Sequence, residues 1–399
     1  MEPVFFLPNN APAMFFRLHS LRPRLAVSFS FFACGFLFAS WAARIPAFKD
    51  QLSLDEAQLG GILFMLPLGS ILALPLAGWV VDRIGSRHVT AVSTFLYAVS
   101  LWSLSQATDA FGLALGLFVF GFVGDFLNIS MNTQGLSVQQ LGEGPILSGL
   151  HAQWSLGAFA GAFLAGWCWQ RGLSTALHFQ IVALLVSIPA LAVGFWMVPD
   201  PAKEDSNRKV YARPDRALLL LGVICFCNTL AEGAMADWSS LYYREVLSPG
   251  VGTRTTGYVA FTVAMALGRF LGDGLMQRLG HRNTLILNGT LIAAGLALAL
   301  AFPLPWVVIV GFALTGLGVS SVIPIAYGIA GGSKRMAPAA ALAMVSAIGF
   351  TGFLVGPPMI GLLAHQVGLR HALWIVVALG CVIGISAKKG MAARQGLVH

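Results

Sequence analysis

The sequence predicts an all-α integral membrane protein with twelve transmembrane helices in two pseudo-symmetric six-helix bundles. Of its 399 residues, 57% are hydrophobic and 10% are charged, against about 45–50% and about 25% in soluble domains. Many stretches of about 20 residues carry almost no charge, and a helix of that length crosses the hydrocarbon core. Runs such as 73–81 and 291–301 are apolar on every side and lack the two-residue alternation of a membrane β-barrel.

The apolar stretches give twelve predicted spans at 25–46, 56–80, 88–107, 111–138, 145–168, 175–198, 217–242, 255–276, 284–302, 304–330, 338–364 and 370–387. They divide the chain into an N-terminal segment (1–24), a first bundle (25–198), a linker (199–216), a second bundle (217–387) and a tail (388–399). The linker is rich in charged residues, with Pro, Ser and Asn, and is predicted to be a solvated loop.

The Lys and Arg residues predict the orientation, because short cytoplasmic loops hold an excess of positive charge. Most of the 24 Lys and Arg residues lie on the side shared by both termini, including those of the linker and the tail. We therefore expect a multi-pass protein of the cell (inner) membrane with both termini in the cytoplasm. The net charge of +8 follows from this loop bias and does not indicate nucleic-acid binding.

The first span is preceded by basic residues, as a signal peptide is, but eleven more spans follow, so we expect a retained helix. The five cysteines all fall within predicted spans, at no zinc-like or redox-motif spacing. They are predicted to be small packing residues. We expect no metal site and no cofactor.

An internal repeat relates the two halves. A shift of 195 residues superimposes Arg83, Gly85, Arg87, Gly157, Gly161 and Gly166 on Arg278, Gly280, Arg282, Gly352, Gly356 and Gly361. Single glycine matches carry little weight in a chain with 45 glycines, but the shared R-x-G-x-R spacing and the common offset are specific. The repeat indicates duplication of a six-helix unit.

The loop after the second span carries a longer motif. It reads Gly78-Trp-Val-Val-Asp82-Arg83-Ile-Gly85-Ser-Arg87-His88, which resembles the G-x-x-x-D-R-x-G-x-R signature of the major facilitator superfamily. The second R-x-G-x-R resembles its degenerate copy. This resemblance implies the major facilitator fold, in which two six-helix bundles rock around a central site. Three further stretches look like the branch related to fucose permease: Ser40-Trp41-Ala42 to Pro46, His151 to Gly157, and Ala231-Glu232-Gly233 to Asp237-Trp238.

The signature loop is expected to act as a gating latch. Gly78 permits a close helix approach, Gly85 permits a tight turn, and Asp82 can face a helix N-terminus when the cytoplasmic side is shut. The alternative is an ordinary charged turn. In the second copy Gln277 replaces the acid and Asp273 takes the place of Gly78, so a latch and a plain turn both stay open there.

Carboxyl groups inside the predicted spans are candidates for function, because a charge at mid-span costs about 2.5–3.5 kcal/mol on insertion scales. Asp125 lies near the middle of the fourth span, and helical periodicity places Asn128 and Asn132 on the same face. We expect this polar stripe to line a substrate cavity. Hydrogen bonding to neighbouring helices is the alternative. The resemblance to the fucose-permease branch implies an acid where Asn128 stands.

Glu232 lies near the centre of the seventh span, with Asn228 one turn earlier on the same face. Burial favours the neutral acid, so the protonation of Glu232 could follow the side to which the cavity opens. We expect a proton carrier or substrate ligand, with a structural acid as the alternative. Asp237 and Trp238 either line the mouth of the cavity or anchor the helix at the interface.

His151, Gln153 and Trp154 begin the fifth span. A sugar-like solute could stack on Trp154 or Trp238 while amide and acid groups bond its hydroxyls. A structural histidine is an equal alternative for His151. Two arginines are expected to have other roles: Arg44 as a snorkelling cation, and Arg269 as the partner of Asp273 one turn away.

These features predict a secondary transporter that works by alternating access and couples uptake of a small polar, sugar-like solute to protons. The expected partners are the lipid bilayer, the solute and protons, and the protein is expected to be a monomer. A proton-driven exporter is the alternative, although 157–166 lacks the Gly-Pro-Gly signature that resemblance to the exporters would require. An enzyme is not expected, because the sequence has no H-E-x-x-H, G-x-S-x-G or Cys/His spacing.

Overall fold

The computed structural model describes residues 11–140, 146–199, 216–247, 255–331 and 338–395, and gives the backbone alone at 11–20, 140, 148, 273, 331, 338–340, 342–343 and 390–395. In these residues the regular structure is helical and contains no strand. The prediction of an all-α protein is therefore confirmed. Residues 1–10 of the N-terminal segment, 200–215 of the linker and 396–399 of the tail lie outside the described residues.

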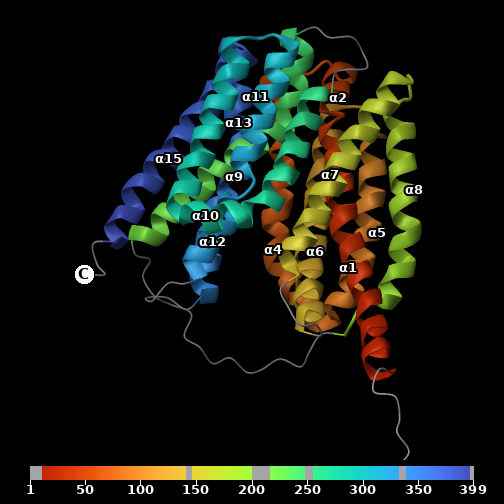
Figure 1. The fold of residues 1–399 in the computed structure, drawn as a ribbon. Helices are drawn as coiled ribbons and strands as arrows, with labels where there is room; N and C mark the ends of the chain where they lie inside the picture. The colour runs from red at the N-terminus through yellow and green to blue at the C-terminus, as the bar shows by residue number, and fades with distance from the viewer. Residues whose placement is uncertain (1–10, 141–145, 200–215, 248–254, 332–337, 396–399) are drawn as a thin grey trace, which may run out of the picture.

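The helices form two groups that lie side by side. The first group contains α1 (Ala11–Ala42), α2 (Ile45–Gln51), α3 (Glu56–Leu63), α4 (Met65–Ile84), α5 (Ser86–Leu104), α6 (Ala110–Gln140), α7 (Leu147–Gln170), α8 (Thr175–Val193) and the 3-10 helix η1 (Gly194–Trp196). The second contains α9 (Arg216–Leu247), α10 (Thr256–Ala301), α11 (Pro305–Val319), α12 (Val322–Gly331), α13 (Pro338–Val367), α14 (Leu369–Ala372) and α15 (Trp374–Gln395). Figure 1 shows the first group on the right, from red to yellow-green, and most of the second on the left, in cyan and blue.

Helical segments occupy all twelve predicted spans. Within the described chain, nine segments are long and apolar enough to cross a membrane. The three other predicted spans are filled by α5, α7 and the first part of α10. Helix α10 contains two of the predicted spans. They meet at Gly280, which has non-helical φ and ψ.

Three predicted spans are broken where a proline follows. The first span divides into α1 and α2 before Pro46, the second divides into α3 and α4 before Pro67, and the tenth divides into α11 and α12 before Pro324. Proline cannot donate to the carbonyl four residues earlier, so the helix is interrupted at the preceding turn. At its other end, α1 begins at Ala11 rather than at residue 25, so the first helix extends into the predicted N-terminal segment.

In both bundles, a glycine at the equivalent position packs against the backbone of the first long helix. A Cβ on Gly157 of α7 would lie 2.0 Å from the carbonyl oxygen of Phe32 on α1. At the related position, a Cβ on Gly352 of α13 would lie 2.5 Å from the carbonyl oxygen of Phe226 on α9. Only glycine permits such an approach between helix backbones. The packing of the two halves therefore supports the predicted duplication.

Replacing Gly157 by Ala is expected to destabilise the protein by about 1–3 kcal/mol, because the new methyl group forces α1 and α7 apart. The measurement is the thermal unfolding midpoint of the purified protein in detergent. The matched control is Gly149→Ala on the same helix, where a Cβ meets nothing within 4 Å. Equal unfolding midpoints for the two variants would contradict the proposed packing role.

The two R-x-G-x-R turns also share their backbone and their contacts. Gly85 has φ 93° and ψ 141°, and Gly280 has φ 75° and ψ 162°, a left-handed φ that favours glycine. Arg87 Nε donates to Gly194 O at 3.2 Å, and Arg282 Nη2 donates to Lys388 O at 3.3 Å. In each bundle, therefore, the second arginine donates to a backbone carbonyl in the last long helix or at its end.

Candidate functional site

A cavity of about 240 Å³ lies between the two bundles. Three carboxyl groups line it: Asp125 on α6, and Glu232 and Asp237 on α9. Aromatic residues form much of the remaining wall, namely Phe38, Tyr97, Trp154, Tyr258, Phe261, Phe350 and Phe353. Ligand pockets usually enclose about 300–1,000 Å³. This cavity therefore suits a small solute.

The polar stripe predicted on the fourth span reaches the cavity in part. Asp125 and Asn128 line it, and Asp125 is only 4% exposed. The Asp125 Oδ2 atom has no hydrogen-bond partner among the described residues. Asn132 lies one turn further along and donates to the carbonyl oxygen of Asn128 at 2.8 Å and to its Oδ1 at 3.1 Å. Asn132 thus bonds to its own helix.

The candidates on α9 divide between the cavity and the core. Glu232 and Asp237 line the cavity. Asn228 and Trp238 are completely buried, and Asn228 Oδ1 and Trp238 Nε1 have no hydrogen-bond partner within the described residues. At the level of Asn228 the helix packs against α13, where Thr229 Oγ1 donates to Gly349 O at 2.5 Å. One turn therefore separates a residue that faces the cavity from one enclosed by packing.

The three candidates on α7 have different surroundings. Trp154 lines the cavity, with its ring 6.2 Å from that of Phe38. His151 is exposed and makes an edge contact with Phe31 at 5.2 Å between ring centroids. Gln153 is half-buried and does not line the cavity. The structure thus brings Trp154 to the acids and leaves His151 and Gln153 outside the cavity wall.

Arg269 of α10 joins the two bundles beside the cavity. Its Nη1 donates to Ser155 Oγ on α7 at 2.6 Å, and its Nη2 lies 3.4 Å from Glu232 Oε1 on α9. The guanidinium also lies over the Trp154 ring, 5.5 Å from its centroid. The sequence pairs Arg269 with Asp273, whose side chain lies outside the described residues. The sequence does show an arginine in the middle of a predicted span. It does not show the partners of this arginine, because they depend on how the bundles pack.

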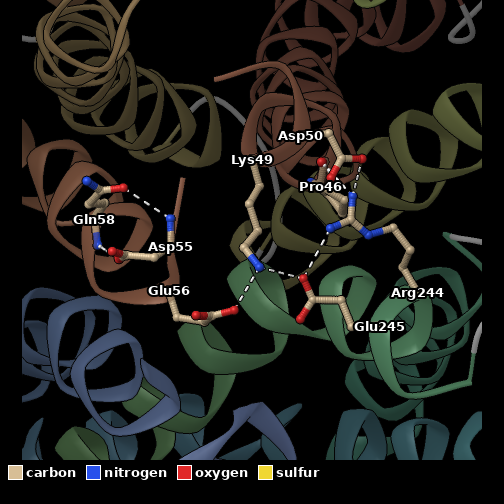
Figure 2. Close-up of polar contacts among 8 residues, drawn as sticks. All are labelled: Pro46, Lys49, Asp50, Asp55, Glu56, Gln58, Arg244 and Glu245. Carbon is tan, nitrogen blue, oxygen red and sulfur yellow. Dashed lines mark hydrogen bonds and ion pairs between the residues drawn. The ribbon is translucent and has the colours of Figure 1, made fainter. Parts of the chain in front are cut away.

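A second polar cluster joins the bundles at the α2 end of the molecule (Figure 2). We call it the interbundle ion cluster, and it contains Lys49, Asp50, Glu56, Arg244 and Glu245. Lys49 Nζ lies 2.7 Å from Glu56 Oε1 and 2.6 Å from Glu245 Oε1. Arg244 Nη1 lies 2.5 Å from Asp50 Oδ2, and its Nη2 lies 3.1 Å from Glu245 Oε1. None of these five residues was predicted from the sequence to belong to a site.

The helices beside the ion cluster pack closely across the bundles. Asp55 and Gln58 form a capping box that begins α3, with Gln58 N donating to Asp55 Oδ1 at 2.7 Å (Figure 2). Further along α3, a Cβ on Gly60 would lie 2.7 Å from Pro357 O on α13. Arg244 Nη1 also donates to Pro46 O at 2.8 Å. The two bundles are therefore joined at the α2 end.

Comparison with known proteins identifies this two-bundle architecture. Residues 26–330 and 255–389 match the sequence profile of the Major Facilitator Superfamily. The chain belongs to this superfamily. It is accordingly a multi-pass membrane transporter of the superfamily's type.

Relatives and solved structures agree with this assignment. The membrane protein MosC of Rhizobium meliloti is 31% identical over 366 residues, which cover 91% of this chain and 88% of MosC. An uncharacterized MFS-type transporter of Yersinia pestis is 30% identical over 92% of this chain and 95% of its own length. A crystallised point mutant of the nucleoside transporter NupG has the same fold, with a TM-score of 0.78 at 14% identity, covering 92% of this chain and 99% of NupG.

The superfamily signature lies at the end of α4 opposite the ion cluster, about 30 Å away along a 20-residue helix. Arg83 lies over the Trp79 ring, 5.0 Å from its centroid. A Cβ on Gly78 would meet nothing within 4 Å, so no described residue approaches Gly78 closely in this conformation, and its role in the latch stays a prediction. The latch is predicted to act when its own end is shut, whereas here the bundles are joined at the other end. The roles of Asp82 and of the second copy, from Arg278 to Arg282, stay predictions.

Arg44 does not snorkel as the sequence analysis expected. It is 3% exposed, and its Nε lies 3.3 Å from His178 Nδ1 of α8. Its Nη2 donates to Leu173 O at 3.3 Å, and the guanidinium lies 5.1 Å from the Trp169 ring centroid. The expectation failed because periodicity cannot show that the end of α7 folds over this side chain. Arg44 thus ties α1 to the connection between α7 and α8.

Proposed function

We propose that the protein imports small hydroxylated, sugar-like solutes together with protons, by alternating access around the central cavity. The observation that carries the proposal is the cavity itself, in which three carboxyl groups and several aromatic rings meet between two bundles. Substrate and ion sites of such carriers lie at the interface between repeats. The motifs that resemble the fucose-permease branch include Trp154, Glu232 and Asp237, which line this cavity.

Glu232 is proposed as the proton carrier because it pairs with Arg269. The ionised carboxylate attracts the Arg269 guanidinium, whose other contacts are Ser155 and Trp154 in the first bundle. A proton on Glu232 removes this attraction and frees Arg269 from one of its partners. Protonation of Glu232 therefore changes the partners of Arg269, the residue that links the second bundle to the first.

Sugar recognition is proposed from the wall of the cavity. Tyr97, Trp154 and Tyr258 contribute aromatic rings to this wall, against which the carbon face of a sugar ring can pack. Asn128 and the carboxyl groups supply donors and acceptors for hydroxyls. A solute of this kind satisfies both sets of groups at once.

The proposal is tested by a ligand screen and then by a transport assay. Purified protein would be screened by thermal shift against sugars, polyols, amino acids, peptides and common drugs, and each hit would be labelled for uptake into proteoliposomes. An acidic exterior is expected to raise the initial uptake of a sugar or polyol hit at least fivefold, and a protonophore should remove the increase. Hits confined to drugs, or uptake that ignores the pH gradient, would overturn it.

The orientation that uptake requires is tested separately. A reporter fused after His399 and another inserted within 199–215 are expected to report the cytoplasm, since these segments lie on the Lys- and Arg-rich side. A reporter near Ser248 is expected to report the exterior. An exterior signal from the linker would contradict the twelve-span topology.

A further inference from the structure

Acidic groups outnumber basic groups around the cavity. Its lining contains the carboxyl groups of Asp125, Glu232 and Asp237 and, among the described residues, no Lys, Arg or His side chain. Arg269 approaches from the edge and pairs with Glu232 at 3.4 Å. Two carboxyl groups thus line the cavity without a cationic partner in the described chain.

Asp125 is the more constrained of these two acids. Its side chain is 4% exposed, and Oδ2 has no hydrogen-bond partner among the described residues. Asn128 lies three residues further along the same helix and also lines the cavity. A buried carboxylate is costly unless a donor or cation compensates its charge. The carboxyl group of Asp125 lines the cavity without a compensating cation, which a positively charged group of a bound solute would supply.

The cavity wall also suits a cation. The Arg269 guanidinium lies 5.5 Å from the centroid of the Trp154 ring, so one aromatic face of the wall already holds a positive group. Tyr97 and Tyr258 line the same cavity and offer further ring systems. A cation beside an aromatic face gains about 0.5–2 kcal/mol, depending on its desolvation. Aromatic rings and an unpaired carboxylate together favour an ammonium group.

We propose that the solute is a small hydroxylated amine, such as an amino sugar or amino polyol, whose ammonium group pairs with the carboxylate of Asp125. The proposal rests on the proposed function, because it names the substrate class of the same site. Glu232, already paired with Arg269, keeps the role of proton carrier. The alternative is a neutral sugar bound to a protonated Asp125, and the charge of the ligand separates the two.

The experiment compares two pairs of probes that differ only in an ammonium group and a hydroxyl. Glucosamine is compared with glucose, and glucamine with sorbitol, by calorimetric titration of the purified full-length protein at pH 7. The amine of each pair is expected to bind at least tenfold more tightly than its hydroxyl analogue. Equal binding, or tighter binding of glucose and sorbitol, would overturn the inference.

Two variants then test which carboxyl group binds the ammonium group. In Asp125→Asn, the preference for the amine is expected to fall to within about threefold, while the affinity for the hydroxyl analogue changes less, because only the charged contact is lost. Asp237→Asn is expected to keep most of the preference. The reverse pattern would overturn the assignment to Asp125. Since the probe comparison uses the unaltered protein, poor folding of a variant does not affect it.

The failures of the inference and of the proposed function are distinguishable. Gradient-driven uptake of glucose or sorbitol without preference for the amine overturns the inference and supports the proposed function. Preferential binding of the amine without any effect of a pH gradient on its uptake supports the inference and overturns proton coupling. Absence of binding by all four probes overturns both the inference and the sugar-like substrate class.

Discussion

Glu232→Gln is expected to lower pH-gradient-driven uptake at least tenfold while exchange of labelled for unlabelled solute continues. Glutamine resembles the protonated acid but cannot release a proton, so the carrier loses the step that couples the gradient to net transport. Exchange requires only that the loaded carrier reorient, and a permanently neutral side chain permits this. The measurement is initial-rate uptake and counterflow in proteoliposomes of the same protein content.

The pairing with Arg269 calls for a second variant. Glu232→Gln leaves the Arg269 guanidinium without its carboxylate partner, and an uncompensated buried charge destabilises a protein by about 3–5 kcal/mol in known cases. Glu232→Gln/Arg269→Gln removes both charges. If the single variant is poorly folded, the double variant is expected to regain stability and counterflow but not gradient-driven uptake.

Asp109→Asn is a matched control for the loss of one carboxylate. Asp109 is exposed, and its Oδ1 accepts a hydrogen bond from Gly112 N at 2.7 Å at the start of α6. It lies 16 residues from Asp125, or about 24 Å along the helix, so uptake is expected to stay near that of the parent. Full gradient-driven uptake by Glu232→Gln, with the parent's pH dependence, would show that Glu232 is structural.

The helices were predictable because their signal is local. A bilayer requires about 20 apolar residues per span. In a chain with 57% hydrophobic and 10% charged residues, the few charged residues mark where such stretches end. Residue spacing alone also located the turns at Gly85 and Gly280. Helix breaks were harder to predict, because prolines such as Pro46 and Pro324 lie inside stretches that stay apolar on both sides.

The position of Asp125, Trp154 and Glu232 in the cavity wall was predictable, because their residue type and their depth in the span decide it. Periodicity could not separate Asn228 from Glu232, because residues four apart share a helix face and only the packing of α13 encloses one of them. The Arg269 contacts join residues 37 and 114 positions apart. The Lys49–Glu245 pair joins residues 196 positions apart. Such pairs depend on how the bundles meet, which local sequence does not encode.

The interbundle ion cluster is expected to hold the α2 end closed, so removal of its cross-bundle pairs should open that end. Lys49 and Arg244 are each 12% exposed at the side chain and bind carboxylates of the other bundle. Exposed pairs contribute about 0.2–1 kcal/mol each, and these partly buried pairs belong to the upper part of that range. Lys49→Gln/Arg244→Gln is therefore expected to shift the population toward the form open at this end about tenfold, corresponding to about 1.4 kcal/mol.

The chain supplies its own control, because Lys49 binds one carboxylate in each bundle. Glu245→Gln removes a pair that crosses the bundles, whereas Glu56→Gln removes a pair within the first bundle.

The measurement is the labelling rate of Ala236→Cys, a position that lines the cavity, by a membrane-impermeant thiol reagent added from the α2 side. Cys34, which lines the same cavity, and Cys381, which is exposed, would both be replaced by Ser beforehand. Labelling is expected to rise several-fold with Glu245→Gln and much less with Glu56→Gln, since only the former weakens the contact that must break when the bundles rock apart. Equal rates in these two variants would mean that the cluster stabilises local structure and does not gate the α2 end.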